Sequence, residues 1–135
     1  MFDLDRFVTA QDPVIETVLA ELHAGRKRTH WMWFVFPQLR ALGRSGRALF
    51  YGLADMREAE AYVAHATLGP RLVECTLAAM TGHPASAFEI FGSPDDLKFR
   101  SCMTLFSRAE GAPGEFGRAL DLFCDGPDEA TLALL

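Results

Sequence analysis

Apolar residues recur every three to four positions along most of this chain, which is the spacing of one face of an α-helix. The clearest case begins with Asp12 as a predicted N-cap and Pro13 at the first helical position, and it ends at Gly25. Its apolar face comprises Val14, Ile15, Val18, Leu19 and Leu22. A start signal, a period and a stop signal therefore agree on one helix.

Similar signals predict helices along the rest of the chain, with N-caps at Asp3, Ser45, Asp55 and Ser93 and a stop at Gly82. The expected ranges are 2–10, a short helix after residue 45, 55–64, 70–81, 86–91, 93–108, a helix ending near 126 and a final turn within 127–135. No repeat, low-complexity segment or linker divides the sequence. We therefore predict an all-α fold, a single compact multi-helix domain that spans residues 1–135.

The stretch 30–38, His-Trp-Met-Trp-Phe-Val-Phe-Pro-Gln, holds both tryptophans of the chain. By period it fits a buried strand or a buried helix. A helix is favoured, because the other short strand candidates, 49–53 and 88–91, are flanked by helical patterns. It would begin with Thr29 as N-cap and end by Phe36, since Pro37 disfavours a helical conformation in the residue before it. A helix apolar on all sides is a core element, so we predict that this aromatic helix is central.

Composition and cysteine usage agree with a well-filled, reduced domain. Half of the residues are hydrophobic and eleven are Phe. The three cysteines, Cys75, Cys102 and Cys124, form no CxxC motif and each falls in an apolar helical pattern, which predicts core side chains in a cytoplasmic protein. The longest apolar run, 31–36, is too short to cross a membrane, and acids at positions 3 and 5 interrupt any signal-peptide pattern.

Charge is distributed unevenly. Residues 25–47 contain no acid and six bases, which are Arg26, Lys27, Arg28, Arg40, Arg44 and Arg47. Because the whole chain carries −5, the remainder carries −11. This segment fits an anionic small molecule or an acidic protein partner, unless its bases pair with acids elsewhere in the fold. A long nucleic acid is disfavoured because the acidic remainder would repel it.

His30 is the candidate catalytic residue. It lies between a basic triplet and the tryptophans, and nearby positive charge favours the neutral imidazole, which can act as a general base. The alternative is a core histidine bonded to a backbone carbonyl. The sequence contains no G-x-S-x-G motif, P-loop, dinucleotide fingerprint or paired acid–base carboxylates, and no spacing predicts a metal or cofactor. Whether the protein is an enzyme stays undecided at this level.

A pocket beside the aromatic stretch is the predicted ligand site. Trp31 and Trp33 would stack on a flat ligand, and Gln38 would bond its edge. Lys27 and Arg44 would contact a phosphate. Packing in the core is the alternative role for these rings, although two neighbouring indole N–H groups need hydrogen-bond acceptors that a helical core seldom supplies.

Further polar groups complete this predicted site. Ser45 would cap a short helix whose amide groups form a small anion-binding terminus. On the 93–108 helix, one side is apolar and comprises Phe99, Cys102, Met103 and Phe106. Lys98, Ser101 and Thr104 fall on the other side and would form the facing wall of the pocket. Hydroxyls on a helix also bond to carbonyls of that helix, which is the alternative for the last two.

Four motifs carry a family resemblance: GRKRTHWMWFVFPQL at 25–39, LGRS at 42–45, LGPRL at 68–72 and KFRSCMTLF at 98–106. Together they span almost the whole chain, and the first is long enough to be specific. The sequence resembles a bacterial family, domain of unknown function 1810, some of whose members carry a calpastatin label. The resemblance implies a small, soluble, all-helical domain and supplies no accepted activity. The calpastatin label implies no protease inhibition, because that inhibitor is a disordered repeat protein.

Two functional hypotheses follow. In the first, the protein binds a small, flat, anionic ligand such as a nucleotide between the aromatic helix and the 93–108 helix, and His30 beside it is the polar group or the general base of a turnover reaction. In the second, the protein is an interaction module whose basic face docks an acidic partner, and the aromatic stretch belongs wholly to the core. A homo-oligomer is compatible with either hypothesis.

Overall fold

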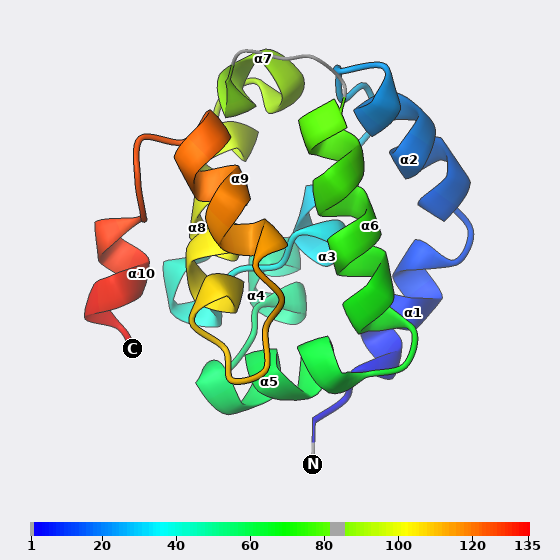
Figure 1. Ribbon diagram of the computed structural model, residues 1–135. Helices are drawn as coiled ribbons and strands as arrows, with labels where there is room; N and C mark the ends of the chain where they lie inside the picture. The colour runs from blue at the N-terminus through cyan, green and yellow to red at the C-terminus, as the bar shows by residue number, and fades with distance from the viewer. Residues whose placement is uncertain (1, 82–85) are drawn as a thin grey trace.

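Helices account for the fold of the described residues, 2–81 and 86–135, in the computed structural model (Figure 1). They are α1 (Asp5–Gln11), α2 (Ile15–His23), α3 (Met32–Val35), the 3₁₀ helix η1 (Arg40–Leu42), α4 (Gly46–Tyr51), α5 (Met56–Ala64), α6 (Leu68–Thr81), α7 (Ala87–Phe91), α8 (Asp95–Ser107), α9 (Glu115–Phe123) and α10 (Glu129–Ala133). Within these ranges no strand forms, and one isolated parallel bridge joins Leu39 to Leu53. The all-α class is confirmed; the predicted stop at Gly82 lies outside the described residues.

Two helices begin at the capping side chains that the sequence predicts. The Ser45 hydroxyl accepts a hydrogen bond from the Ala48 N–H at 3.1 Å, at the start of α4. The Asp55 carboxylate accepts from the Glu58 N–H at 3.1 Å, at the start of α5. Each bond satisfies one of the backbone donors that a helix start leaves free, and such caps contribute about 1 kcal/mol.

The other predicted N-caps are wrong, namely Asp3, Asp12, Thr29 and Ser93. Their helices begin at positions without a side-chain cap, which are Leu4, Val14, Trp31 and Pro94. Asp12 instead pairs with the guanidinium of Arg71 at 2.8 Å, and the Thr29 hydroxyl donates to Glu21 at 2.7 Å. In these two cases a tertiary partner engages the side chain that could have capped a helix.

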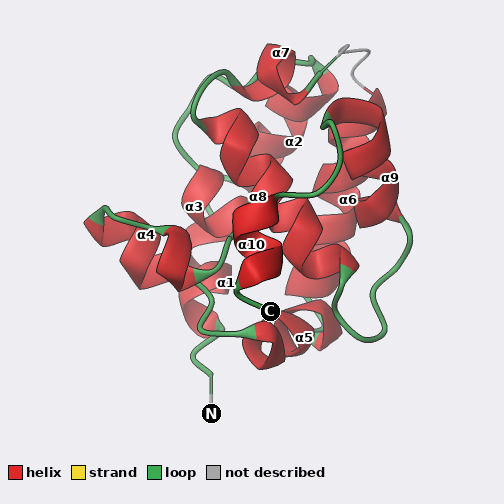
Figure 2. Cartoon of the chain, turned by 90° about the vertical axis from the view of Figure 1, so that its left-hand side faces the viewer, coloured by secondary structure: helices red, strands yellow, loops and turns green. Residues whose placement is uncertain are grey.

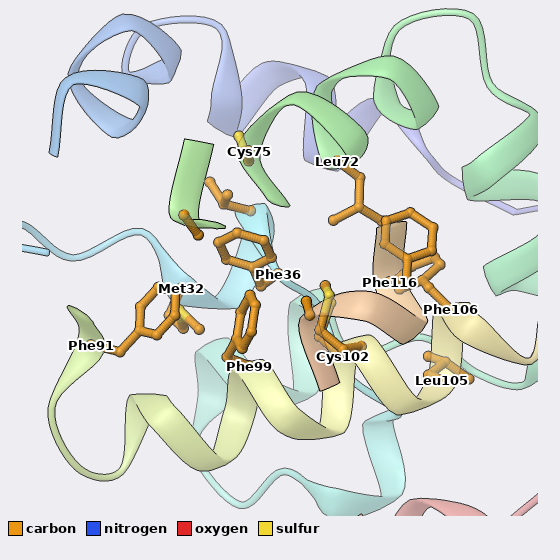
Figure 3. Packing of buried hydrophobic residues seen from close by; sticks show 14 of the residues in the cluster. Met32, Phe36, Leu72, Cys75, Phe91, Phe99, Cys102, Leu105, Phe106 and Phe116 are labelled. Atoms are coloured by element: carbon orange, nitrogen blue, oxygen red, sulfur yellow. The ribbon is translucent and has the colours of Figure 1, made fainter. Parts of the chain in front are cut away.

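The core lies between α6, α8 and α9, with α3 inserted from one side (Figure 3). The predicted apolar side of α8 is confirmed, since all four of its side chains are buried: Phe99, Cys102, Met103 and Phe106. Phe116 from α9 packs on Phe106, with ring centroids 5.9 Å apart. Leu72 and Cys75 of α6 close the other side of this cluster. The residues thus share one hydrophobic core, which is the basis of the single helical domain.

The aromatic stretch lies in the core, as predicted, but little of it is helical. Trp31 and Phe36 are each 1% exposed, and the Phe36 ring meets Phe91 and Phe99 edge to face at 5.8 and 5.1 Å. The predicted helix over residues 29–36 is wrong in extent, because α3 covers only four residues. The segment before α3 is held by hydrogen bonds to Glu21, and Pro37 follows Phe36, the C-cap of α3.

Helix α4 stands out from the helical body (Figure 2). The ends of this excursion are joined by backbone hydrogen bonds, since the Arg40 N–H donates to the Leu53 carbonyl at 2.8 Å and the Leu53 N–H donates to the Gln38 carbonyl at 2.9 Å. Gly52 allows the close approach: a Cβ there would lie 2.4 Å from the Arg40 Cα. The excursion is therefore tightly closed where it joins the core.

Arg6 of α1 holds the C-terminal end of α4. Its guanidinium donates to the carbonyls of Phe50 at 2.9 Å and Gly52 at 3.2 Å, groups that the end of a helix leaves without partners. The same guanidinium pairs with Glu58 at 3.0 Å, and both side chains are nearly inaccessible to solvent. A buried ion pair thus fixes α1, α4 and α5 relative to one another.

Candidate functional site

Trp31 is held by a buried carboxylate. Glu21, 8% exposed, accepts hydrogen bonds from the Arg28 N–H at 2.6 Å, the Thr29 N–H at 3.0 Å, the Thr29 hydroxyl at 2.7 Å and the Trp31 indole N–H at 3.1 Å. Burial raises the pKa of Glu21, but these hydrogen bonds together outweigh burial and lower it. Trp31 offers no surface to a ligand; its ring and its N–H are both used inside the fold.

Lys27 and His30 are also separated from the predicted pocket. The Lys27 ammonium is 5.2 Å from the Trp31 ring centroid and pairs with Asp95 of α8 at 3.0 Å, with only 7% of its side chain exposed. It is therefore neutralised inside the fold. His30 is exposed on the surface, so the alternative of a core histidine is wrong. It does not line the cavity beside Trp33.

Trp33 has different surroundings. It is half-buried, and two cations lie near its ring: the Arg47 guanidinium carbon at 5.0 Å and the Lys98 ammonium at 4.9 Å from the centroid. Its indole nitrogen is buried and has no hydrogen-bond partner among residues 2–81 and 86–135. Lys98 also reaches Asp95, at 3.7 Å, but the shorter contact of that carboxylate is to Lys27.

A small cavity opens beside Trp33. Its lining comprises Met32, Trp33, Phe36, Gln38, Ala48, Tyr51, Gly52 and Lys98. The volume open to the centre of a water molecule is about 10 Å³, which is close to the minimum for one water. Pockets for drug-sized ligands measure roughly 300–1,000 Å³. The cavity as it stands therefore does not accommodate a nucleotide.

The predicted facing wall is present only in part. Lys98 reaches Trp33, whereas Ser101 and Thr104 are turned toward the segment that leads into α10. The Ser101 hydroxyl donates to the Asp128 carboxylate at 3.0 Å, and the Thr104 hydroxyl accepts from the Asp128 N–H at 2.9 Å. Both hydroxyls also contact carbonyls of α8 itself, which was the alternative. Their role is to hold the C-terminal helix.

The outer surface of η1 and α4 carries cations and apolar groups together. Arg40, Arg44 and Arg47 are exposed, and none of the three forms an ion pair within the described part of the chain. Leu49 is 47% and Phe50 58% exposed. We call these five residues the α4 face. Ser45, between two of the arginines, uses its hydroxyl to cap α4.

The contact of Arg47 with Trp33 was not predicted as part of the site. The sequence marks Arg47 as one member of a basic segment, next to the helix start that Ser45 would cap, and no local spacing relates positions 33 and 47. The two meet because the hydrogen bonds between Gln38, Arg40 and Leu53 fold α4 back beside α3. The contact between Arg47 and Trp33 is thus visible only in the tertiary structure.

Neither the acids nor the cysteines of the described residues suggest metal or thiol chemistry. No group of three His, Cys, Asp or Glu side chains in that part of the chain is placed to hold a metal ion. All three cysteines are free. Burial raises the pKa of Cys75 to about 12 and of Cys124 to about 11, and it also raises that of Cys102, so the three stay protonated at neutral pH. As far as the described helices go, none has the length and apolar character needed to cross a membrane.

These features define a small all-helical domain of unknown function. The chain belongs to the family described as "Protein of unknown function (DUF1810)", whose model matches residues 1–135. It is similar to the crystal structure of the conserved hypothetical protein Rv1873 from Mycobacterium tuberculosis, with 55% sequence identity, a TM-score of 0.96, and coverage of 99% of this chain and 96% of that one. No curated protein matches. The family resemblance of the four motifs is confirmed.

Proposed function

We propose that this protein is an interaction module that docks an acidic, partly apolar segment of a partner protein on the α4 face. The observation that carries the proposal is the set of three exposed arginines that form no ion pair with the described acids, placed beside exposed Leu49 and Phe50. Arg47 and Phe50 are separated by one helical turn, so their side chains are neighbours. A partner that satisfies this face must supply carboxylates and apolar groups together.

Charge complementarity supports an acidic partner. The remainder of the chain carries a net −11, yet these arginines form no ion pair within the part of the chain that the structure describes. Exposed arginine and aromatic side chains are enriched where protein interfaces have their strongest contacts. The face also extends from the body on a helix, which makes it accessible to another chain (Figure 2).

Preorganisation supports docking as well. Arg6 binds the end of α4, and the backbone bonds of Leu53 close the excursion. A surface held in this way loses little conformational entropy when a partner binds. The nucleotide hypothesis finds less support, because the cavity beside Trp33 has room for about one water. Lys27, Trp31, Ser101 and Thr104 already have partners inside the fold.

Selection from a displayed library of random peptides on the immobilised protein tests this proposal. Acidic peptides with Leu, Phe or Trp should be enriched on wild type. Enrichment should be lost on the double variant Arg44→Glu, Arg47→Glu and reduced on Phe50→Ser, because the first reverses the charge of the face and the second removes its exposed ring. Arg118→Glu, at an exposed site on α9, is the matched control and should select the same peptides as wild type. Enrichment of neutral or basic peptides, or equal selection by all variants, would contradict the proposal.

A further inference from the structure

We infer that Trp33, Arg47 and Lys98 form a subsite for a single oxyanion, a carboxylate or a phosphate group, at the mouth of the cavity beside Trp33. The inference does not depend on docking of a protein at the α4 face, because it rests on the hydrogen-bonding and charge of these three side chains alone. The subsite would bind one oxyanion and does not involve Leu49 or Phe50, the apolar residues of the α4 face.

Trp33, Arg47 and Lys98 present hydrogen-bond donors to one another. An indole N–H, a guanidinium and an ammonium are donors only, and none of them can accept a bond from another. The Trp33 indole nitrogen is buried and has no partner in the described part of the protein. Gln38 lines the same cavity, but no hydrogen bond joins its side chain to the indole. These three side chains therefore need a hydrogen-bond acceptor from outside their own set.

The surroundings of the Trp33 ring carry excess positive charge. The Arg47 guanidinium carbon and the Lys98 ammonium lie 5.0 and 4.9 Å from the centroid of the Trp33 ring, so two positive charges border one indole. Asp95 pairs with Lys98 at 3.7 Å, but its shorter contact, at 3.0 Å, goes to Lys27. Counting Lys27, Asp95, Lys98 and Arg47 together leaves an excess of two positive charges. An oxyanion would offset this excess positive charge and accept hydrogen bonds at the same time.

The size of the cavity beside Trp33 limits the ligand. The cavity takes about one water, so the body of a phosphate or carboxylate would lie outside it, beside the Trp33 indole that Arg47 and Lys98 border. Both side chains are long and are partly or fully exposed, which lets them adjust around the anion. The cavity has no room for a nucleotide base. The subsite therefore selects a small anionic group and not a flat ring system.

The two indole N–H resonances in a ¹H–¹⁵N correlation spectrum test this inference directly, because the chain has only two tryptophans. Inorganic phosphate and, separately, acetate are titrated at constant ionic strength set with sodium chloride. The Trp33 indole resonance, assigned by its loss in Trp33→Phe, should shift saturably. The Trp31 resonance should not, since its N–H is bonded to Glu21. Arg47→Met and Lys98→Met should each weaken the apparent affinity tenfold or more.

Arg44→Met is the matched control, because it removes a charge from the same face without touching the Trp33 ring, and it should bind as wild type does. Phosphate tighter than acetate would indicate a phosphate-bearing ligand, and similar affinities would indicate a carboxylate such as an acidic side chain. If a water satisfies the indole N–H and no subsite exists, the shift will be linear in anion or equal in all variants, and the inference is overturned. Phe50→Ser separates the two proposals: it should reduce peptide selection and leave phosphate binding intact.

Discussion

Trp31 and Trp33 are two residues apart in one short stretch, yet their surroundings are opposite in kind. Trp31 is 1% exposed and donates its N–H to Glu21. Trp33 is half-buried, has no acceptor for its N–H among the described residues, and lies beside Arg47 and Lys98. Around a helical turn, positions two apart point in directions about 200° apart, so neighbours in sequence look toward different parts of the protein.

This difference distinguishes structure from candidate function. Buried polar groups in native proteins nearly always have partners, and the Glu21 network around Trp31 follows that rule. Trp33 departs from it at the border of an exposed basic face. A departure of this kind costs stability unless something else supplies the missing bond.

Glu21→Ala should have the largest effect. It leaves the backbone N–H groups of Arg28 and Thr29 and the indole N–H of Trp31 without an acceptor, so the free energy of unfolding should fall by about 3 kcal/mol or more. Urea denaturation followed by circular dichroism measures the loss. Glu16→Ala, at an exposed position on the same helix, should change stability by less than about 0.5 kcal/mol. Equal losses in the two variants would show that the Glu21 network is not structural.

Trp31→Phe should come second, with a loss of about 2 kcal/mol from the smaller buried ring and the missing bond to Glu21. The same denaturation experiment measures it. In a double-mutant cycle with Glu21→Ala, the two losses should be less than additive, because both changes remove one shared hydrogen bond. Full additivity would argue that the bond contributes nothing.

Acid should weaken the same network. Hydrogen bonds lower the pKa of Glu21 in the folded protein. Its ionised form therefore stabilises the fold at pH values above the ordinary glutamate pKa of about 4.3, and this contribution is lost as pH falls through the lower, folded value. Stability measured by urea denaturation between neutral pH and that region should fall more steeply in wild type than in Glu21→Gln. Parallel curves would contradict this.

Trp33→Phe should have the smallest effect on stability, within about 0.5 kcal/mol, because the substitution removes a donor that has no partner and retains a ring for the two cations. Thermal unfolding of this variant beside Trp31→Phe gives the most direct test of the comparison. If Trp33→Phe were as destabilising as Trp31→Phe, Trp33 would be a core anchor and the proposed subsite would lose its basis.

Short-range signals explain what could be predicted of the fold. Ser45 and Asp55 cap helices because donor and acceptor lie three residues apart, and the apolar side of α8 follows from its period. Asp12 and Thr29 look equally suitable as caps, but Arg71 and Glu21 engage them instead. A local pattern cannot reveal a competitor that lies far away in the chain.

The candidate site shows the same limit. Lys98 was predicted to face the aromatic stretch, and it does reach Trp33. Ser101 and Thr104 share its helix side by spacing, yet Asp128, more than twenty residues later, takes both hydroxyls. Arg47 reaches the ring only because the 38–53 excursion closes on itself.

Periodicity, caps and composition were enough to establish an all-helical protein with the aromatic stretch inside it, because helix formation depends on interactions within a few residues along the chain. The roles of the two tryptophans depended on the tertiary structure. Glu21 reaches Trp31 across ten positions, and Arg47 and Lys98 reach Trp33 from two other helices. The packing of those helices decides which indole N–H has a hydrogen-bond acceptor and which indole borders a cationic surface. Hydrogen bonds and charges act through space, so positions along the chain do not reveal them.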